Sequence, residues 1–190
     1  MEQLREDRKY TYQDYLQWDD GERWELIDGV PYNMSPAPTF EHQLIVHNLS
    51  RVIGNALQGK KCITGITPTD VYLSEHDLVQ PDVFVVCDEN KIHRDIIRGA
   101  PDLIFEVLSP SSMRKDRREK KRLYERFGVR EYIMVEPQGK IIERYKRGED
   151  HLFDRGEIFA EEEEFELFSL PGIKIRVPDV FTNTERFDKK

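Results

Sequence analysis

The spacing of apolar and polar positions changes along the chain, and each change predicts a different element. Residues 103–108 form a continuous apolar run that only Glu106 interrupts, which is typical of a central strand covered on both faces. Side chains alternate along a strand, so Glu106 points the same way as Ile104 and Leu108. An unpaired buried carboxylate is strongly unfavourable, and Glu106 therefore needs a cation, a hydrogen-bond donor or a proton.

The next repeat is helical and turns a lysine toward the same interior. Positions spaced i, i+3, i+4 and i+7 share one helix face, and here they are Lys120, Leu123, Tyr124 and Phe127. Asp116 lies one turn earlier on that face, and Gly128 is suited to end the helix. The pattern thus predicts an acid and a lysine that face one interior.

The remaining pattern predicts a mixture of strands and helices in one α+β domain. In chain order we expect a short helix at 12–18, a hairpin of 24–27 and 30–34, a helix at 40–57, strands within 62–66, 69–74 and 78–87, a strand at 131–135, and short strands after 137 and 164. The polar segment 90–98 predicts a loop with a turn of helix. Because a helix separates the strands at 103–108 and 131–135, we expect them to be parallel.

Length and composition are those of a single folded domain spanning residues 1–190. The chain contains no apolar stretch near the roughly 18 residues that cross a membrane. Its first residues lack an apolar signal region, which predicts a cytoplasmic protein with no membrane partner. Cys62 and Cys87 lack CxxC spacing, so we expect both to be reduced and expect no structural zinc site.

Charge is distributed unevenly along the chain. The net charge is −8, which disfavours a protein that coats nucleic acid non-specifically. Residues 114–130 nevertheless hold nine Lys or Arg against three acids, a local excess of +6. A basic helix beside a buried acid would help to hold a phosphate backbone, but a solvated helix face with i,i+4 ion pairs explains the charge equally well.

Asp82 is the best candidate for a second carboxylate beside Glu106. It follows Pro81 at the entrance of an apolar strand, and antiparallel pairing of that strand with 103–108 would make the two acids neighbours. A hard divalent ion such as Mg²⁺ or Mn²⁺ would resolve their repulsion, and Lys120 could then orient a water or stabilise a phosphoryl group. The alternative is a Glu106–Lys120 ion pair that only specifies packing.

Two further residues have open roles at this stage. Glu25 lies in the first predicted strand, either as an exposed edge residue or as another carboxylate of the site. His42 lies on the apolar stripe of the helix at 40–57, where a satisfied core histidine is the simpler interpretation. His47 is five residues further, about 140° around the helix, so the two histidines cannot form an i,i+4 metal clip.

Six short motifs occur in an order that resembles a known family. They are ELIDG at 25–29, PTFEHQ at 38–43, QPDVFVV at 80–86, GAPDLIFEVLSPSS at 99–112, D-x-x-x-K-x-x-x-Y at 116–124 and GVREYIMVEP at 128–137. The chain resembles the PD-(D/E)XK superfamily of restriction-endonuclease-like nucleases, and it is more similar still to the Uma-type family of endonucleases.

The resemblance implies a fold and an activity. The expected fold is a mixed β-sheet flanked by helices, with extra N-terminal and C-terminal β-hairpins and a core over about residues 10–181. The expected activity is hydrolysis of DNA phosphodiester bonds with a divalent metal. A homodimer is also expected, since many such nucleases cut as dimers. The rival expectation is a nuclease fold without catalysis that binds nucleic acid or protein.

The resemblance also implies roles for particular residues. Asp82 and Glu106 would ligate the metal, with the Val107 carbonyl as a possible third ligand. The superfamily places a lysine two residues after this glutamate, where this chain has Leu108. As in the Uma-type relatives, Lys120 would take its place. Glu25 and His42 also fall in matching motifs, which favours positions beside the site.

Overall fold

Two β-sheets dominate the structure, and each draws strands from separate parts of the chain. The computed structural model describes residues 8–34 and 36–187. The larger sheet runs from edge to edge as β11 (Glu157–Phe159), β10 (Ile141–Lys146), β9 (Glu131–Glu136), β8 (Leu103–Val107), β6 (Val83–Val86) and β3 (Ile63–Ile66). The second sheet runs as β2 (Val30–Asn33), β1 (Trp24–Ile27), β5 (Asp77–Val79), β4 (Asp70–Ser74) and β7 (Ile96–Arg98). A separate pair, β12 (Glu164–Glu166) and β13 (Lys174–Arg176), lies near the C-terminus.

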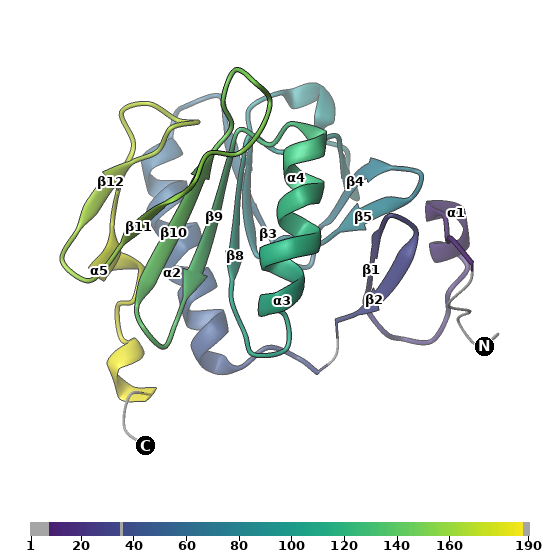
Figure 1. Ribbon diagram of the computed structural model, residues 1–190, viewed down its shortest axis with the longest axis horizontal. Helices are drawn as coiled ribbons and strands as arrows, with labels where there is room; N and C mark the ends of the chain where they lie inside the picture. The colour runs from purple at the N-terminus through teal and green to yellow at the C-terminus, as the bar shows by residue number, and fades with distance from the viewer. Residues whose placement is uncertain (1–7, 35, 188–190) are drawn as a thin grey trace.

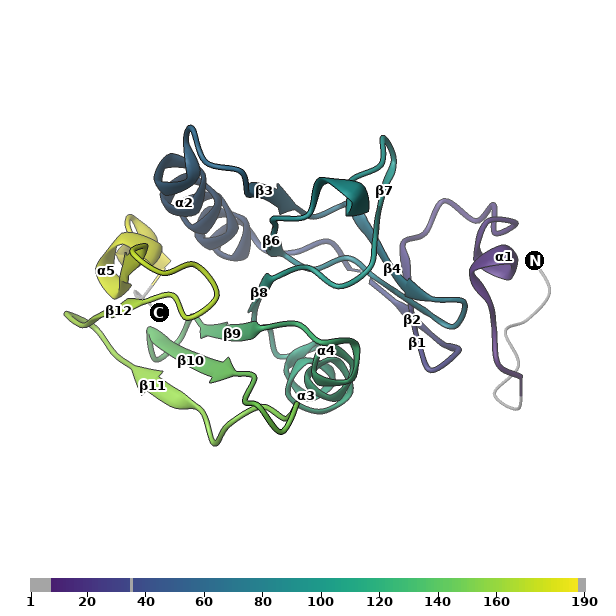
Figure 2. The same cartoon turned by 90° about the horizontal axis from the view of Figure 1, so that it is seen from above.

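Helices cover both faces of the larger sheet. Figure 2 shows α2 (Phe40–Leu57) on one side, and on the other a continuous helix made of α3 (Met113–Lys115), a π-helical turn (Asp116–Lys120) and α4 (Lys121–Phe127). The short helices are α1 (Tyr12–Tyr15), α5 (Val177–Val180) and the 3₁₀ turns Glu89–Lys91 and Thr184–Phe187. In the described part of the chain, no helix is long and apolar enough to span a membrane.

The two faces of β8 pack against different helices, as the alternation of its side chains predicts. Leu103 and Phe105 join the apolar cluster that includes Ile45 of α2. Ile104 joins the opposite cluster, which includes Tyr124 of α4. Glu106 has the same parity as Ile104, so its carboxylate is directed toward the α3–α4 helix.

Strand pairing agrees with the orientations expected from the sequence. β6 pairs antiparallel with β8, and Val83 lies opposite Phe105. β8 pairs in parallel with β9 across the α3–α4 helix. In Figure 1 the second sheet lies to the right of the larger one. The chain passes from the second sheet into the larger one through residues 80–82, between β5 and β6, so the Pro-Asp pair lies in the connection between the two sheets.

Two predicted elements differ from the structure. The first helix ends at Tyr15 rather than near residue 18. The segment predicted as a loop contains β7, whose Ile96 and Ile97 are buried and which pairs in parallel with β4. Two adjacent apolar residues carry no period of their own, and this strand depends on a partner more than twenty positions earlier in the chain.

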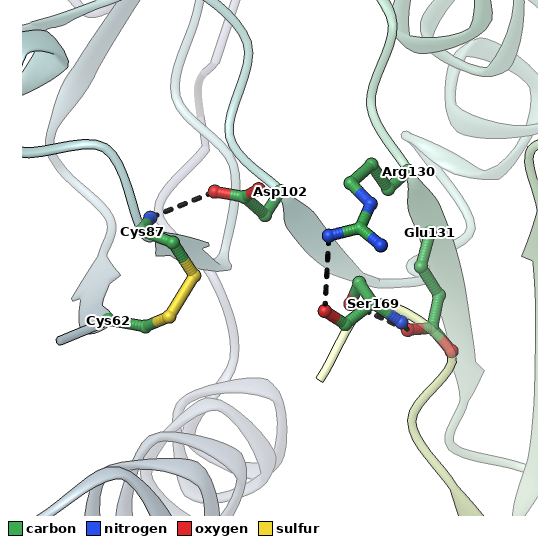
Figure 3. The surroundings of a disulfide bond; sticks show 6 residues. All are labelled: Cys62, Cys87, Asp102, Arg130, Glu131 and Ser169. Carbon is green, nitrogen blue, oxygen red and sulfur yellow. Dashed lines mark hydrogen bonds between the residues drawn. A yellow bond between two sulfur atoms is a disulfide. The ribbon is translucent and has the colours of Figure 1, made fainter. Parts of the chain in front are cut away.

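The prediction of reduced cysteines was wrong, because Cys62 and Cys87 form a disulfide (Figure 3). Ile63 of β3 lies opposite Val86 of β6, so the cysteines just beyond these residues also face each other, with Cα atoms 4.0 Å apart. Cysteines can be bridged without moving the backbone only where their Cα atoms lie within about 7 Å, and antiparallel pairing brings these two that close. Their separation of 25 residues hid the pairing from a search for short spacings.

Candidate functional site

Asp82 and Glu106 meet where β6 begins and β8 ends. The antiparallel register sets them side by side, and the Asp82 backbone N lies 3.4 Å from Glu106 Oε2. The Val107 backbone N–H donates to Asp82 Oδ2 at 2.8 Å, which orients that carboxylate. The predicted proximity of the two acids is therefore present in the structure.

Lys120 connects this pair to Glu25 of β1. Its ammonium group lies 2.7 Å from Glu25 Oε1 and 2.8 Å from Glu106 Oε1, and Asp116 Oδ1 is 3.8 Å away. The lysine side chain is only 4% exposed, and the Glu25 side chain is fully buried. Of the two interpretations of Glu25, the exposed edge residue is wrong, since it lies inside the cluster.

Lys115 is a site residue that the sequence did not reveal. Its ammonium group lies 2.6 Å from Glu25 Oε2, while Lys120 binds the other oxygen of the same carboxylate. In a regular α-helix, residues five apart differ by about 140° and cannot share a partner. The turn between them is π-helical, with i→i+5 hydrogen bonds that stack residues five apart. Nothing in the apolar repeat signals such a turn.

Tyr124 was predicted only as an apolar anchor, yet its hydroxyl donates to Glu106 Oε1 at 2.7 Å. Glu106 Oε1 therefore accepts from both Lys120 and Tyr124. Among the described residues, Glu106 Oε2 has only the long contact to the Asp82 amide. The available signal was the tyrosine that ends the D-x-x-x-K-x-x-x-Y motif.

His42 reaches the site from the first turn of α2, which Thr39 caps by accepting the His42 backbone N–H. The ring Nε2 lies 3.2 Å from Asp82 Oδ2, and both side chains are largely buried, at 13% and 15% exposure. Nδ1 of the ring is buried and has no hydrogen-bond partner among the residues the structure describes. The histidine therefore contacts Asp82 from α2, which lies on the opposite face of the larger sheet from the helix that carries Lys120.

The two buried glutamates of the site, Glu25 and Glu106, have opposite pKa shifts. Burial alone would raise the pKa of Glu25, but Lys120 and Lys115 outweigh it and lower the pKa to about 2. Burial likewise raises the pKa of Glu106, and here Lys120 is opposed by Asp82 and other acids, so that the pKa rises to about 8. Glu25 is therefore ionised at neutral pH. Glu106 is mainly protonated at neutral pH, and a bound cation would favour its ionised form.

The other titratable groups respond to the same crowding of acids. Burial would lower the pKa of Lys120, but Glu106, Glu25 and Asp116 raise it well above its ordinary value. Burial would also lower the pKa of His42, and its hydrogen bond to Asp82 reverses the direction. Burial raises the pKa of Asp116. The site holds more carboxylates than its two lysines balance, which favours an added cation.

The donor set fits a hard divalent ion in part. Within residues 8–34 and 36–187, no three His, Cys, Asp or Glu side chains are placed to hold a metal ion together. Asp82 and Glu106 offer carboxylate oxygens, and Glu106 Oε2 lies beside Asp82 with no short contact in the described residues. Carboxylate and carbonyl oxygens are the ligands that Mg²⁺ and Mn²⁺ prefer.

Leu108, where the resemblance implies a lysine, is a core residue. Its side chain is 3% exposed and belongs to the apolar cluster beneath the α3–α4 helix. The lysine nearest to Glu106 comes instead from the following helix, as the helical spacing of Lys120 predicted.

The mixed sheet flanked by helices on both faces is a restriction-endonuclease-like fold. The same arrangement of elements is found in the crystal structure of a protein from Anabaena variabilis described as a "putative nuclease belonging to DUF820". That structure matches with a TM-score of 0.73 and 19% identity over 90% of this chain and 97% of its own.

Residues 12–178 match the model of the Uma2 family, described as "Putative restriction endonuclease", and the chain belongs to this family. An uncharacterized protein from Synechocystis sp. is 31% identical over 146 residues, which cover 75% of this chain and 76% of that protein. The resemblance drawn from the six sequence motifs is thereby confirmed.

Proposed function

We propose that this protein is an endonuclease that hydrolyses DNA phosphodiester bonds with Mg²⁺ or Mn²⁺. The observation that carries the proposal is the contact of Asp82 with Glu106 beside the ammonium group of Lys120. Family membership and the restriction-endonuclease-like fold support it.

Asp82, Glu106 and the Val107 carbonyl would hold the ion. The bound metal would lower the pKa of a water and neutralise charge on a phosphoryl oxygen. The Val107 N–H and His42 hold the Asp82 carboxylate in place, while Tyr124 and Lys120 bind one oxygen of Glu106 and leave the other for the ion.

Lys120 would stabilise charge on the phosphate or orient the attacking water. Glu25 binds this ammonium group through a short contact, and Asp116 lies further away on the same helix face. These contacts fix where the lysine lies before substrate arrives, so little reorganisation is needed during the reaction.

A plasmid-nicking assay tests the catalytic roles. With Mn²⁺, wild-type protein should convert supercoiled plasmid to the open circle, and Glu106→Ala should reduce the rate about 100-fold or more, since the metal supplies several kcal/mol of transition-state stabilisation. Glu149→Ala, at an exposed position in the turn after β10, is the control and should cut like wild type. Equal rates for wild type and Glu106→Ala would reject the assignment.

The second candidate is a nuclease fold that binds nucleic acid or protein without cutting it. Two observations favour it: Leu108 stands where the superfamily has a lysine, and the described residues hold no group of three metal-ligating side chains. Calorimetry with Mn²⁺ separates the two candidates. A binding isotherm that Asp82→Asn abolishes supports the enzyme, and no heat of binding by wild type supports the module.

A further inference from the structure

The outer face of the α3–α4 helix carries an arginine ridge, which we define as Arg114, Arg118 and Arg122. Between residues 113 and 127 the exposed positions are these three and Arg126, so every exposed side chain of this helix is an arginine. The ridge residues are spaced by four, and eight residues of helix correspond to about 12 Å.

The other cations of this helix have partners inside the protein. Arg117 forms two hydrogen bonds with Glu143, and Arg126 contacts Asp28 and Asp77. Lys121 lies over the ring of Tyr145, and the two remaining lysines belong to the site cluster.

The arginine ridge has no such partners in the described part of the chain. No hydrogen bond or ion pair joins Arg114, Arg118 or Arg122 to any described side chain. Like charges four residues apart on a helix destabilise it by a few tenths of a kcal/mol, and an ordinary solvated face would alternate them with acids. The stability of the fold therefore gives no reason for three unpaired arginines on one helix face. Binding of an external polyanion does, because it would neutralise their charge.

We propose that the arginine ridge binds the phosphodiester backbone of duplex DNA and holds it alongside the site. The inference rests on the proposed function for its substrate. Arg114 directly precedes Lys115, whose ammonium group contacts Glu25 of the site, so one end of the ridge adjoins the site and the other leads away from it. Guanidinium groups bind phosphate oxygens in a bidentate way. A local ridge also explains how a chain with a net charge of −8 could bind DNA.

Salt dependence of DNA binding tests the proposal. Binding of a labelled duplex is measured in EDTA, which prevents cutting, at about 50 to 200 mM salt, and each lost phosphate contact lowers the slope of log K against log salt by about 0.9. We expect the variant R114Q/R118Q/R122Q to lower this slope by about 2 to 3 and to weaken binding at low salt about 10-fold to 100-fold. Its melting temperature should not fall, because like charges have been removed.

The matched control removes three other exposed arginines. R51Q/R94Q/R155Q makes the same change in net charge on α2 and in two loops, and none of these arginines has an ion pair among the described residues. It should keep most of the affinity and slope. Equal losses in both variants, no loss in the ridge variant, or no binding by wild type would each overturn the proposal. Stronger ridge-dependent binding of duplex RNA would overturn its choice of DNA.

The outcome separates the ridge from the catalytic assignment. If the ridge variant binds DNA like wild type while nicking still requires Glu106, the proposed role of the arginine ridge is wrong and the proposed function stands. If DNA binding depends on the arginine ridge but neither wild type nor any variant cuts DNA, the arginine ridge binds DNA in a protein that does not cut it.

Discussion

Two buried glutamates on neighbouring strands of the larger sheet have contrasting surroundings. Glu106 is the last residue but one of β8 and Glu131 begins β9, so they lie toward opposite ends of a parallel pair, and both are at most 3% exposed. Figure 3 shows Glu131 beside Ser169, whose backbone N–H and hydroxyl both donate to Glu131 Oε2. The Phe168 N–H donates to Oε1, and Arg144 lies 4.0 Å away.

Glu106 has fewer donors and more acids around it. Lys120 and Tyr124 both bind Oε1, while Oε2 faces Asp82. Glu131 has short hydrogen bonds on both oxygens and ties the segment after β12 to the sheet. Burial alone therefore does not identify a site. Glu106 differs from Glu131 because one of its oxygens accepts only a long hydrogen bond and faces a second acid.

Removal of Lys120 should have the largest effect on stability. Lys120→Met leaves Glu25 and Glu106 without their shared cation, and losing one partner of a buried ion pair costs about 3 to 5 kcal/mol. Urea unfolding without metal measures the loss. The control is Lys121→Met, which removes a contact with the Tyr145 ring that is worth about 1 kcal/mol. Equal losses in the two variants would show that Lys120 is not the central cation.

Glu131→Ala should separate stability from activity. Its removal leaves the Phe168 and Ser169 donors without their acceptor, at an expected cost of about 2 to 4 kcal/mol. Well below the melting temperature, the folded variant should still nick plasmid at the wild-type rate. If the folded Glu131→Ala protein fails to cut, Glu131 is needed for activity as well as stability, and the proposed difference between the two glutamates is wrong.

The pH dependence of stability should distinguish Glu106 from an ordinary acid. Its pKa rises from 4.5 to about 8 on folding, so between these values the folded protein holds the proton that the unfolded chain has released. Raising the pH through this window therefore destabilises metal-free wild type, by at least about 1.4 kcal/mol, the equivalent of one pKa unit. Glu106→Gln lacks this titration. The unfolding free energy of wild type minus that of Glu106→Gln should therefore fall as the pH rises from about 4.5 to about 8. A constant difference would contradict the raised pKa.

Much of the site was readable in the sequence because its residues lie in strong local patterns. Glu106 interrupts a continuous apolar strand, and Lys120 falls on the apolar face of a helix, so both had to point inward. The Pro-Asp pair marked a strand entrance, and the antiparallel register that the structure shows then sets Asp82 beside Glu106.

The roles of Lys115 and Glu25 could not be predicted from the sequence pattern. The apolar repeat assumes a regular α-helix, whereas the π-helical turn rotates Lys115 onto the same face as Lys120. The sequence left Glu25 as either an edge residue or a site residue. The structure decides this, because β1 pairs with β5 and the Gln80 N–H, at the connection between the two sheets, donates to the Glu25 carboxylate.

By itself, the sequence determined the period of each main element, the inward direction of Glu106 and Lys120, and the family. Tertiary structure alone decided the Cys62–Cys87 disulfide, the strand at 96–98, the double-lysine contact of Glu25 and the unpaired state of the arginine ridge within the described residues. The physical reason is range. Periodicity records which face of an element is buried, but a partner for a charge, a thiol or an edge strand depends on which distant segment packs against it.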